Sequence, residues 1–176
     1  MKEFQIRPAT DADFDAMWSI FSAHVAAGET YTFTPETGRE AAHAYWLGPA
    51  VSSFVAVLDN ERVLGMYRIT PNQAGRGAHV ANGSYMVSPS AQGAGVGRLL
   101  GEHSLDEARR QGYLAMQFNF VVSTNAAAVQ LWKNLGFSIV GTLPKAFCHR
   151  RLGYVDAYVM YQLLGDPDDW PAAGEA

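Results

Sequence analysis

The chain has little cysteine, no long apolar run and no signal-like N-terminus, and each shortage excludes a class of protein. Cys148 is the single cysteine among 176 residues, so no internal disulfide can form, which is typical of proteins from a reducing compartment. No stretch of about 18 apolar residues is present to span a bilayer. The first residues lack the apolar core of a secretory signal. We therefore expect a cytoplasmic protein without a membrane partner.

Positive charge is also scarce. Lysine and arginine number 13 against 17 acidic residues, for a net charge of -4, and no basic block or basic-aromatic stripe occurs. Nucleic acid is therefore not expected as a partner. The five histidines form no pair with metal-ligand spacing, so we expect no metal. What is present is a globular composition, with 48% hydrophobic and 17% charged residues.

Hydrophobic periodicity predicts strands and helices in the order β-α-α-β-β-β-α-β-α-β-β. The predicted strands are 3–8, 53–58, 63–70, 79–87, 113–122, 137–143 and 154–164, and the predicted helices are 10–26, 36–47, 95–110, 125–135. This alternation favours an α/β fold with a mixed sheet and helices on both faces. The near-continuous apolar run 113–122 predicts a strand that is buried on both faces. We expect one domain over 1–165 and an acidic, flexible tail over 166–176.

A glycine-rich loop lies between the fourth predicted strand and the helix 95–110. Its sequence, YMVSPSAQGAGVGRLL from Tyr85 to Leu100, contains Gly93, Gly95 and Gly97. Glycines let the backbone approach a phosphate, and the free N–H groups of a helix N-terminus attract anions. The loop matches neither a Walker loop nor the Rossmann fingerprint. It predicts a pyrophosphate site, and the alternative is a glycine turn without a ligand.

A second motif, NAAAVQLWKNLGF from Asn125 to Phe137, predicts a helix that ends at Gly136 in a left-handed conformation. Together the two segments resemble the GNAT superfamily of coenzyme A-dependent N-acyltransferases. The positions that match V-x-P-x-x-[QR]-x-x-G-x-[GA] are Val87, Pro89, Gln92, Gly95 and Gly97. The positions that match N-x-x-A-x-x-[LF]-[YW]-x-x-x-G-F are Asn125, Ala128, Leu131, Trp132, Gly136 and Phe137. The similar element order covers most of the chain.

The resemblance implies a GNAT fold with a splayed pair of central strands and acetyl-CoA as co-substrate. At the splay, the main chain of one strand pairs with the pantetheine arm as in strand addition. The residues implied to contact the coenzyme are Tyr85, Met86, Val87, Gln92, Gly93, Ala94, Gly95, Val96, Gly97, Arg98 and Asn125. Ala94 stands where many members carry a basic residue, so the loop is expected to depend on N–H groups. Dimers are common in the family, and a homodimer is therefore expected.

The resemblance also exposes a missing acid. Acyl transfer needs an oxyanion donor and a proton for the leaving thiolate, and a main-chain N–H of the fourth strand supplies the donor. Many relatives protonate the thiolate with a tyrosine where this chain has Trp132, whose indole is a very weak acid. Tyr31, Tyr85 or water are the alternatives, as is departure of the thiolate itself. We therefore interpret Trp132 as a residue that packs in the core. Direct attack needs no covalent intermediate, so Cys148 is not required.

Four residues are candidates for the acceptor side: Glu29, Tyr31, Asn82 and Asn119. The segment 29–34, ETYTFT, is similar to a stretch of the phosphinothricin-type acetyltransferases. The positions of the two asparagines resemble enzymes that acetylate L-azetidine-2-carboxylate. The amides would orient a substrate carboxylate or amine, or else bond neighbouring backbone. Glu29 would be a general base, or else a solvated loop carboxylate.

These resemblances imply transfer of an acetyl group from acetyl-CoA to the amine of a small molecule, a free amino acid or an analogue of one. Two alternatives stay open. One is a protein N-terminal or lysine acetyltransferase, which needs an open groove where ETYTFT suggests a closed aromatic pocket. The other is a noncatalytic acyl-CoA sensor.

Overall fold

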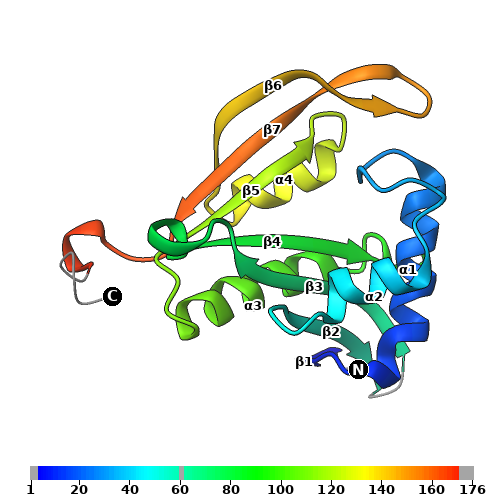
Figure 1. Cartoon of the computed structure of the whole chain (residues 1–176), viewed down its shortest axis with the longest axis horizontal. Coiled ribbons are helices and arrows are strands. Elements are labelled where there is room, and N and C mark those ends of the chain that lie inside the picture. The colour runs from blue at the N-terminus through cyan, green and yellow to red at the C-terminus, as the bar shows by residue number, and fades with distance from the viewer. Residues whose placement is uncertain (1–3, 60–61, 171–176) are drawn as a thin grey trace.

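The structure is a computed structural model that describes residues 4–59 and 62–170, and it contains a single seven-stranded sheet (Figure 1). The strand order is β1-β2-β3-β4-β5-β7-β6. The strands are β1 (Phe4–Pro8), β2 (Ser52–Leu58), β3 (Arg62–Pro71), β4 (Val80–Val87), β5 (Ala115–Val122), β6 (Ser138–His149) and β7 (Gly153–Leu163). The helices are α1 (Phe14–Ala27), α2 (Arg39–Leu47), α3 (Val96–Arg110) and α4 (Ala126–Asn134). This order confirms the one predicted from periodicity.

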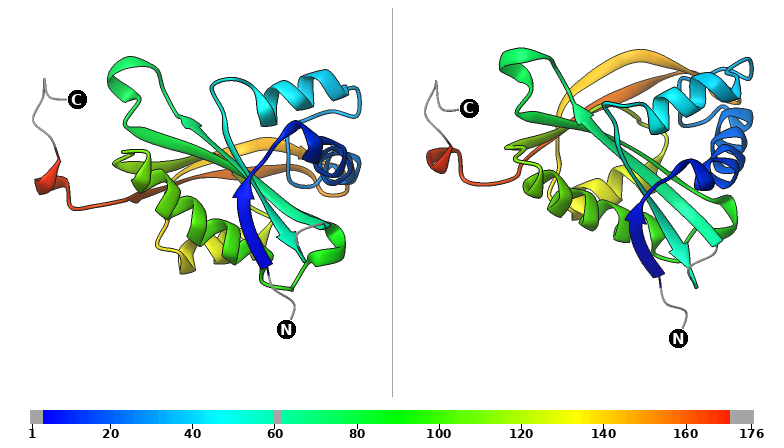
Figure 2. Two further views of the ribbon diagram at one scale, coloured as in Figure 1. Left: turned by 90° about the horizontal axis from the view of Figure 1, so that it is seen from below. Right: turned by 60° about the horizontal axis from the view of Figure 1, so that its bottom comes forward.

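Two helix pairs cover opposite faces of the sheet (Figure 2). From Gly65 onward in β3, and along β4, odd-numbered positions such as Tyr67 and Ala81 face the core beneath α3 and α4. Even-numbered positions, such as Met66 and Met86, join the core beneath α1 and α2. The two faces of β4 therefore belong to different halves of the molecule, because side chains alternate along a strand.

β4 and β5 form the one parallel pair among the described strands, and they stay paired only from Val80–Ala115 to Asn82–Gln117. Beyond Asn82 the two strands diverge (Figure 1). The predicted splayed pair is confirmed. Divergence leaves the β5-facing edge of β4, from about Gly83 to Val87, without a strand partner, and exposed N–H and C=O groups on such an edge can accept an extended ligand.

Three predictions about the elements are wrong. α2 begins at Arg39 instead of position 36. β6 continues to His149, so it forms a long hairpin with β7 where a loop was expected after position 143. β5 is not buried on both faces, because Asn119 is exposed. The reason is that α1 packs on β3 and β4 and α2 packs on β2, so neither helix covers this face of β5.

Some predictions meet the limits of the described residues. Glu3 at the start of the first predicted strand and two residues of the predicted turn at 59–61 lie outside them. Residues 166–170 of the predicted tail are described and include a 3-10 turn, Pro167–Asp169, beside which the Trp170 ring lies 5.8 Å from the His79 ring. The rest of the tail lies outside, so the boundary near 165 stays a prediction. No helix in the described ranges is long and apolar enough to cross a membrane.

A capping box formed by Thr10 and Asp13 precedes α1, and its carboxylate also binds Arg7. The Thr10 N–H donates to the Asp13 carboxylate at 2.9 Å, and Arg7 donates two hydrogen bonds to it at 2.7 Å. These contacts, led by the Arg7 hydrogen bonds, lower the pKa of Asp13 from 3.8 to about 2. Because the folded-state pKa lies below the unfolded value, ionised Asp13 stabilises the fold above pH 4, and this stabilisation is lost as the pH falls to about 2.

We therefore expect Asp13→Asn to lower the free energy of unfolding at pH 7 by about 1–2 kcal/mol, after allowance for the solvent that screens the half-exposed Arg7. Urea denaturation at several pH values measures the difference from wild type, which should shrink between pH 4 and pH 2. Asp15→Asn is the control, because the Asp15 side chain is 88% exposed. A difference that does not change with pH would contradict this assignment.

Candidate functional site

The glycine-rich loop is shaped by two left-handed residues. Gly93 has φ 76° and Gly95 has φ 83°, a region that L-residues with a side chain rarely adopt. A Cβ built on either residue would meet no heavy atom within 4 Å. The loop therefore needs glycine for its backbone conformation and presents open space above that backbone, which fits the approach of a diphosphate.

α3 begins at the end of this loop and directs free amides to it. The first hydrogen bond of the helix runs from the Leu99 N–H to the Gly95 carbonyl at 3.1 Å, so the N–H groups of Val96, Gly97 and Arg98 precede any helical partner. Such amides and the helix dipole attract an anion. The Arg98 guanidinium pairs with Glu102 at 2.7 Å, so the main chain is the part of this loop best placed to bind the diphosphate.

Two side chains from the α1 region contact the free edge of β4. The Tyr31 hydroxyl accepts a hydrogen bond from the Tyr85 N–H at 3.0 Å and donates one to the carbonyl of the same residue. The His24 Nε2 lies 2.8 Å from the Val87 carbonyl and therefore carries the proton. The sequence offered Tyr31 as an alternative proton donor, a role that stays a prediction, whereas it gave His24 no role.

The Tyr31 hydroxyl occupies both main-chain hydrogen-bonding groups of Tyr85 on the free edge of β4. Burial raises the pKa of Tyr31 well above its usual value. The hydroxyl is therefore protonated at neutral pH, so it can donate a hydrogen bond, but it is a weaker acid than an ordinary tyrosine and cannot act as a base. Tyr85 itself points to the other face, where its hydroxyl bonds Ser104 Oγ at 2.8 Å. Of the two tyrosines weighed as the general acid, Tyr31 is the one that lies on the strand edge.

The second motif supplies a cap and a core residue. The Asn125 Oδ1 accepts a hydrogen bond from the Ala128 N–H at 3.2 Å and caps α4; contact of Asn125 with the coenzyme stays a prediction. The Trp132 ring is 7% exposed and lies 4.6 Å from the Tyr85 ring and 4.7 Å from the Phe118 ring. This packing supports the interpretation of Trp132 as a core residue.

The two acceptor-side asparagines have different surroundings. Asn82 donates from Nδ2 to the Gln117 carbonyl at 2.9 Å, at the last β4–β5 pair. It thus binds neighbouring backbone, the alternative considered from the sequence, and its Oδ1 remains for a substrate. Asn119 is exposed and lies in a chain of amides, accepting from Gln117 and donating to Asn72 at 2.7 Å each. Substrate binding by both asparagines stays a prediction.

The Glu29 carboxylate forms an ion pair. Its carboxylate lies 2.7 Å from an Arg151 guanidinium nitrogen, at the turn that joins β6 to β7. The main-chain N–H of the neighbouring Arg150 also donates to the Gly28 carbonyl at 3.0 Å. The carboxylate that a general base would need is therefore engaged by arginine, and the base role of Glu29 stays a prediction.

The structure adds acceptor-side residues that the sequence did not single out. Arg68 of β3 lies opposite Ser84 of β4, and its guanidinium stacks on the Tyr45 ring at 4.0 Å. The Tyr45 hydroxyl bonds the Ser84 hydroxyl at 2.6 Å. Phe33 of the ETYTFT segment packs edge-on against Tyr45 at 4.9 Å. Period-2 alternation in β3 and β4 was the available signal, because it places these polar positions on one face.

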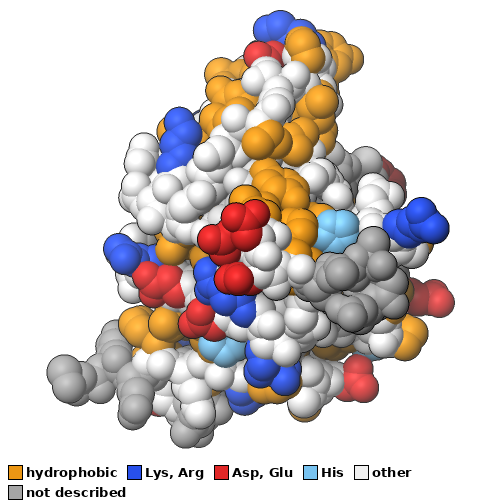
Figure 3. Space-filling model, turned by 90° about the vertical axis from the view of Figure 1, so that its left-hand side faces the viewer, with side chains coloured by type: hydrophobic (Ala, Val, Ile, Leu, Met, Phe, Trp, Pro, Cys, Tyr) orange, Lys and Arg blue, Asp and Glu red, His pale blue; other side chains and the backbone are white. Residues whose placement is uncertain are grey.

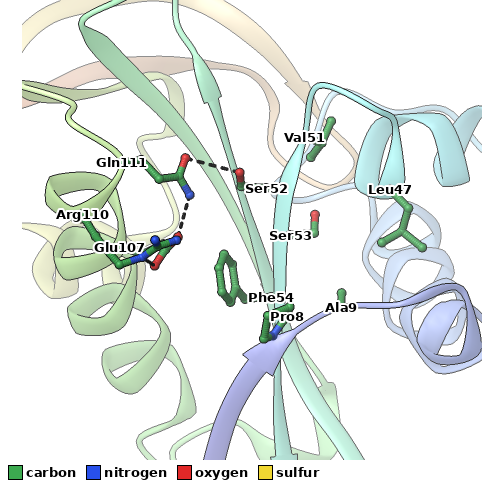
Figure 4. Close-up of a pocket in the computed structure, with 10 residues that line it drawn as sticks. All are labelled: Pro8, Ala9, Leu47, Val51, Ser52, Ser53, Phe54, Glu107, Arg110 and Gln111. Atoms are coloured by element: carbon green, nitrogen blue, oxygen red, sulfur yellow. Dashed lines mark hydrogen bonds and ion pairs between the residues drawn. The ribbon is translucent and has the colours of Figure 1, made fainter.

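A separate hollow of about 310 Å³ lies between the start of β2 and the end of α3 (Figure 4). Its polar side chains are hydrogen-bonded to one another, since Arg110 and Gln111 both donate to the Glu107 carboxylate at 2.7 Å. The hollow lies at the end of α3 that is remote from the glycine loop, so it is not part of the site described here.

A splayed parallel strand pair lies beside a glycine loop and a helix N-terminus, an arrangement that suits a ligand with an anionic group at the loop and an extended arm along the strand edge. The profile of the family described as "Acetyltransferase (GNAT) family" matches residues 15–137, which is more than half of the chain. The chain belongs to this family of N-acetyltransferases.

Two relatives of known description illustrate the range of the family. The chain is 39% identical over 116 residues to N-acetyltransferase aca1 of Schizosaccharomyces pombe, a match that covers 63% of this chain and 54% of aca1. The chain therefore spans about half the length of aca1. It is 29% identical to L-amino acid N-acetyltransferase AaaT of Escherichia coli over 164 residues, which covers 91% of this chain and 98% of AaaT.

Solved structures with the same fold include two of direct relevance. A GCN5-related N-acetyltransferase from Kribbella flavida has a TM-score of 0.87 at 46% identity, with 91% of this chain and 97% of that one covered. The acetyltransferase yncA from Salmonella typhimurium, solved with its cofactor acetyl-CoA, has a TM-score of 0.84 at 25% identity, with 97% and 99% covered. Acetyl-CoA is thus bound by a relative of the same fold.

Proposed function

We propose that this protein transfers an acetyl group from acetyl-CoA to the α-amine of a free amino acid or an amino acid analogue. The observation that carries the proposal is the free β4 edge at Tyr85, which lies beside the glycine loop on one side and the Arg68–Tyr45 group on the other. A donor and a small acceptor would meet at this edge. The relation to AaaT over nearly its whole length supports an amino acid as acceptor.

The chain's own residues have distinct tasks in this proposal. The amides of Val96, Gly97 and Arg98 bind the diphosphate, and the Tyr85 N–H stabilises the carbonyl oxygen as negative charge develops there. To do so the Tyr85 N–H exchanges its partner Tyr31 for the substrate oxygen. The acceptor nitrogen bonds to the acetyl carbon, the carbon–sulfur bond breaks, and the proton that nitrogen loses balances the thiolate. The protonated Tyr31 hydroxyl is proposed to donate a hydrogen bond to the thiolate sulfur, and the proton lost by the acceptor nitrogen neutralises that thiolate.

The test is turnover of acetyl-CoA against a panel of amines, followed by free thiol release and by mass of the acetylated product. The panel contains free amino acids, proline analogues, phosphinothricin, methionine derivatives, and peptides with free N-termini or lysine side chains. We expect release with free α-amino compounds and little with peptides, because the aromatic segment at Tyr31 and Phe33 packs over the acceptor face.

Each alternative function has its own outcome in this panel. Turnover confined to peptides would replace the proposal with a protein acetyltransferase. Tight binding of acetyl-CoA with no thiol release above the uncatalysed rate for any amine would replace it with a sensor. Neither outcome is compatible with an amino acid acetyltransferase.

The predicted homodimer remains part of the proposal. Large apolar side chains are exposed on the β6–β7 hairpin, notably Leu152 at 62% and Tyr154 at 67%. Figure 3 shows hydrophobic side chains gathered toward the upper part of one side of the molecule, where this hairpin lies. Exposed apolar surface of this kind is typical of contact regions, and sedimentation equilibrium decides between monomer and dimer.

A further inference from the structure

Arg68 is a cation on the acceptor face that no described acidic residue neutralises. The ion pairs between described residues involve Arg7, Arg39, His43, Arg98, Arg109, Arg110 and Arg151. Arg68 is in none of them, although its side chain is only partly exposed and packs on the Tyr45 ring. Loss of water around a charge is costly unless an opposite charge or a set of hydrogen bonds compensates.

The hydrogen bonds of the Arg68 guanidinium are also incomplete. Its Nε is buried and has no hydrogen-bond partner among the described residues. Its Nη2 donates to Thr70 Oγ1 at 3.3 Å, a long contact. A buried donor without a partner costs free energy that a ligand can recover. The planar guanidinium fork suits a carboxylate, which accepts two parallel hydrogen bonds.

We propose that Arg68 binds the carboxylate of the acceptor and thereby selects α-amino acids among amines. The proposal rests on the function proposed above and names its specificity-determining residue. Arg68 lies opposite Ser84 in the β3–β4 register, one position before Tyr85. The amine and the carboxylate of an α-amino acid share one carbon, so a carboxylate at Arg68 directs the amine toward the Tyr85 edge.

The surroundings of Arg68 agree with this placement. Its positive charge acts to lower the pKa of Tyr31, against the larger opposing effect of burial, so the guanidinium is electrostatically close to the hydroxyl on the β4 edge. Asn82 lies two positions before Ser84 on the same strand face, and its hydrogen bond to the Gln117 carbonyl uses Nδ2 and not Oδ1. An ammonium or amine hydrogen is the group that such an oxygen accepts.

The test compares Arg68→Gln and Arg68→Lys with wild type on two acceptors: the free amino acid that the wild type acetylates fastest, and the carboxamide of that amino acid. We expect Arg68→Gln to lower kcat/KM for the acid about 10–100-fold, mainly through KM, since a charged hydrogen bond is lost. Activity with the amide should stay within about twofold, and Arg68→Lys should recover part of the loss, because lysine keeps the charge without the fork.

Arg39→Gln is the matched control. Arg39 also stacks on aromatic rings, with 5.2 Å to Phe14 and 5.5 Å to Trp18, but it lies at the start of α2 and pairs with Asp15. It should therefore leave the preference for acid over amide unchanged. Thermal unfolding and acetyl-CoA affinity of the Arg68 variants separate a lost contact from a lost fold.

The outcomes are distinct. If the wild type acetylates the amide as well as the acid, or if Arg68→Gln lowers both activities equally, the role of Arg68 is overturned while the proposed function stands. If the wild type acetylates no free amino acid in the panel, the proposed function fails and the carboxylate site fails with it.

Discussion

Gly95→Glu is expected to reduce the affinity for acetyl-CoA by more than about 100-fold, because it places a bulky carboxylate among the amides that would bind a diphosphate. Gly95 precedes α3 with φ 83°, and the space above it is open. The new side chain would occupy that space and repel the ligand's negative charge. Isothermal titration with acetyl-CoA measures the loss.

A glycine at the other end of α3 provides a matched control for the backbone strain that this substitution introduces. Gly112, just after α3, also has φ 83° and no heavy atom within 4 Å of an added Cβ. Gly112→Glu therefore carries a similar backbone strain, about 1 kcal/mol, at the opposite end of the helix. It should keep acetyl-CoA affinity near that of wild type. Equal affinity in the two variants would show that the diphosphate does not bind at this loop.

Trp132→Ala is expected to lower the free energy of unfolding by about 3–5 kcal/mol, as truncation of a large buried aromatic does. The Trp132 ring packs against the rings of Tyr85 and Phe118, and its Cζ3 atom lies 3.1 Å from a Cβ built on Gly101. Removal would open a cavity where α3, α4 and the sheet meet. Chemical denaturation followed by circular dichroism gives the size of the loss.

Trp132→Phe distinguishes packing from chemistry at this position. The smaller ring keeps much of the apolar contact, so we expect activity within a few-fold of wild type, whereas removal of a general acid costs about 10²–10⁴-fold. Trp18→Ala serves as the stability control, because Trp18 lies on α1 and is not fully buried. A large loss of kcat in a well-folded Trp132→Phe protein would contradict the core assignment.

Local sequence patterns were sufficient to predict the glycine loop and most of the order of helices and strands. The glycine loop and the end of α4 at Gly136 depend on residues that are close in the chain, and the predicted left-handed conformation of Gly136 is confirmed by its φ of 100°. β6 was predicted too short because its pairing with β7 shifts between Leu143 and Phe147, with Lys145 at φ 53°. Such a bulge interrupts the alternation by which a strand is recognised.

The acceptor side was harder to predict because its contacts join distant segments. The bond between Tyr31 and Tyr85 links residues 54 positions apart, and the neighbours of Arg68 depend on the register of β3 and β4. The predicted burial of Asn119 was wrong for the same reason, since which face of β5 the helices cover depends on where α1 and α2 pack. A periodic pattern indicates that a strand has faces, but it does not say what covers them.

The turn at the tip of the β6–β7 hairpin is hydrogen-bonded to the end of α1. The Arg150 side chain donates to the Ala26 carbonyl at 2.6 Å, and its N–H donates to the Gly28 carbonyl at 3.0 Å. The C-terminal hairpin thus anchors the last turn of α1, immediately before the aromatic segment that reaches the β4 edge. A change in the length of this turn would therefore shift the aromatic segment and, under the proposed function, alter which acceptors fit at the β4 edge.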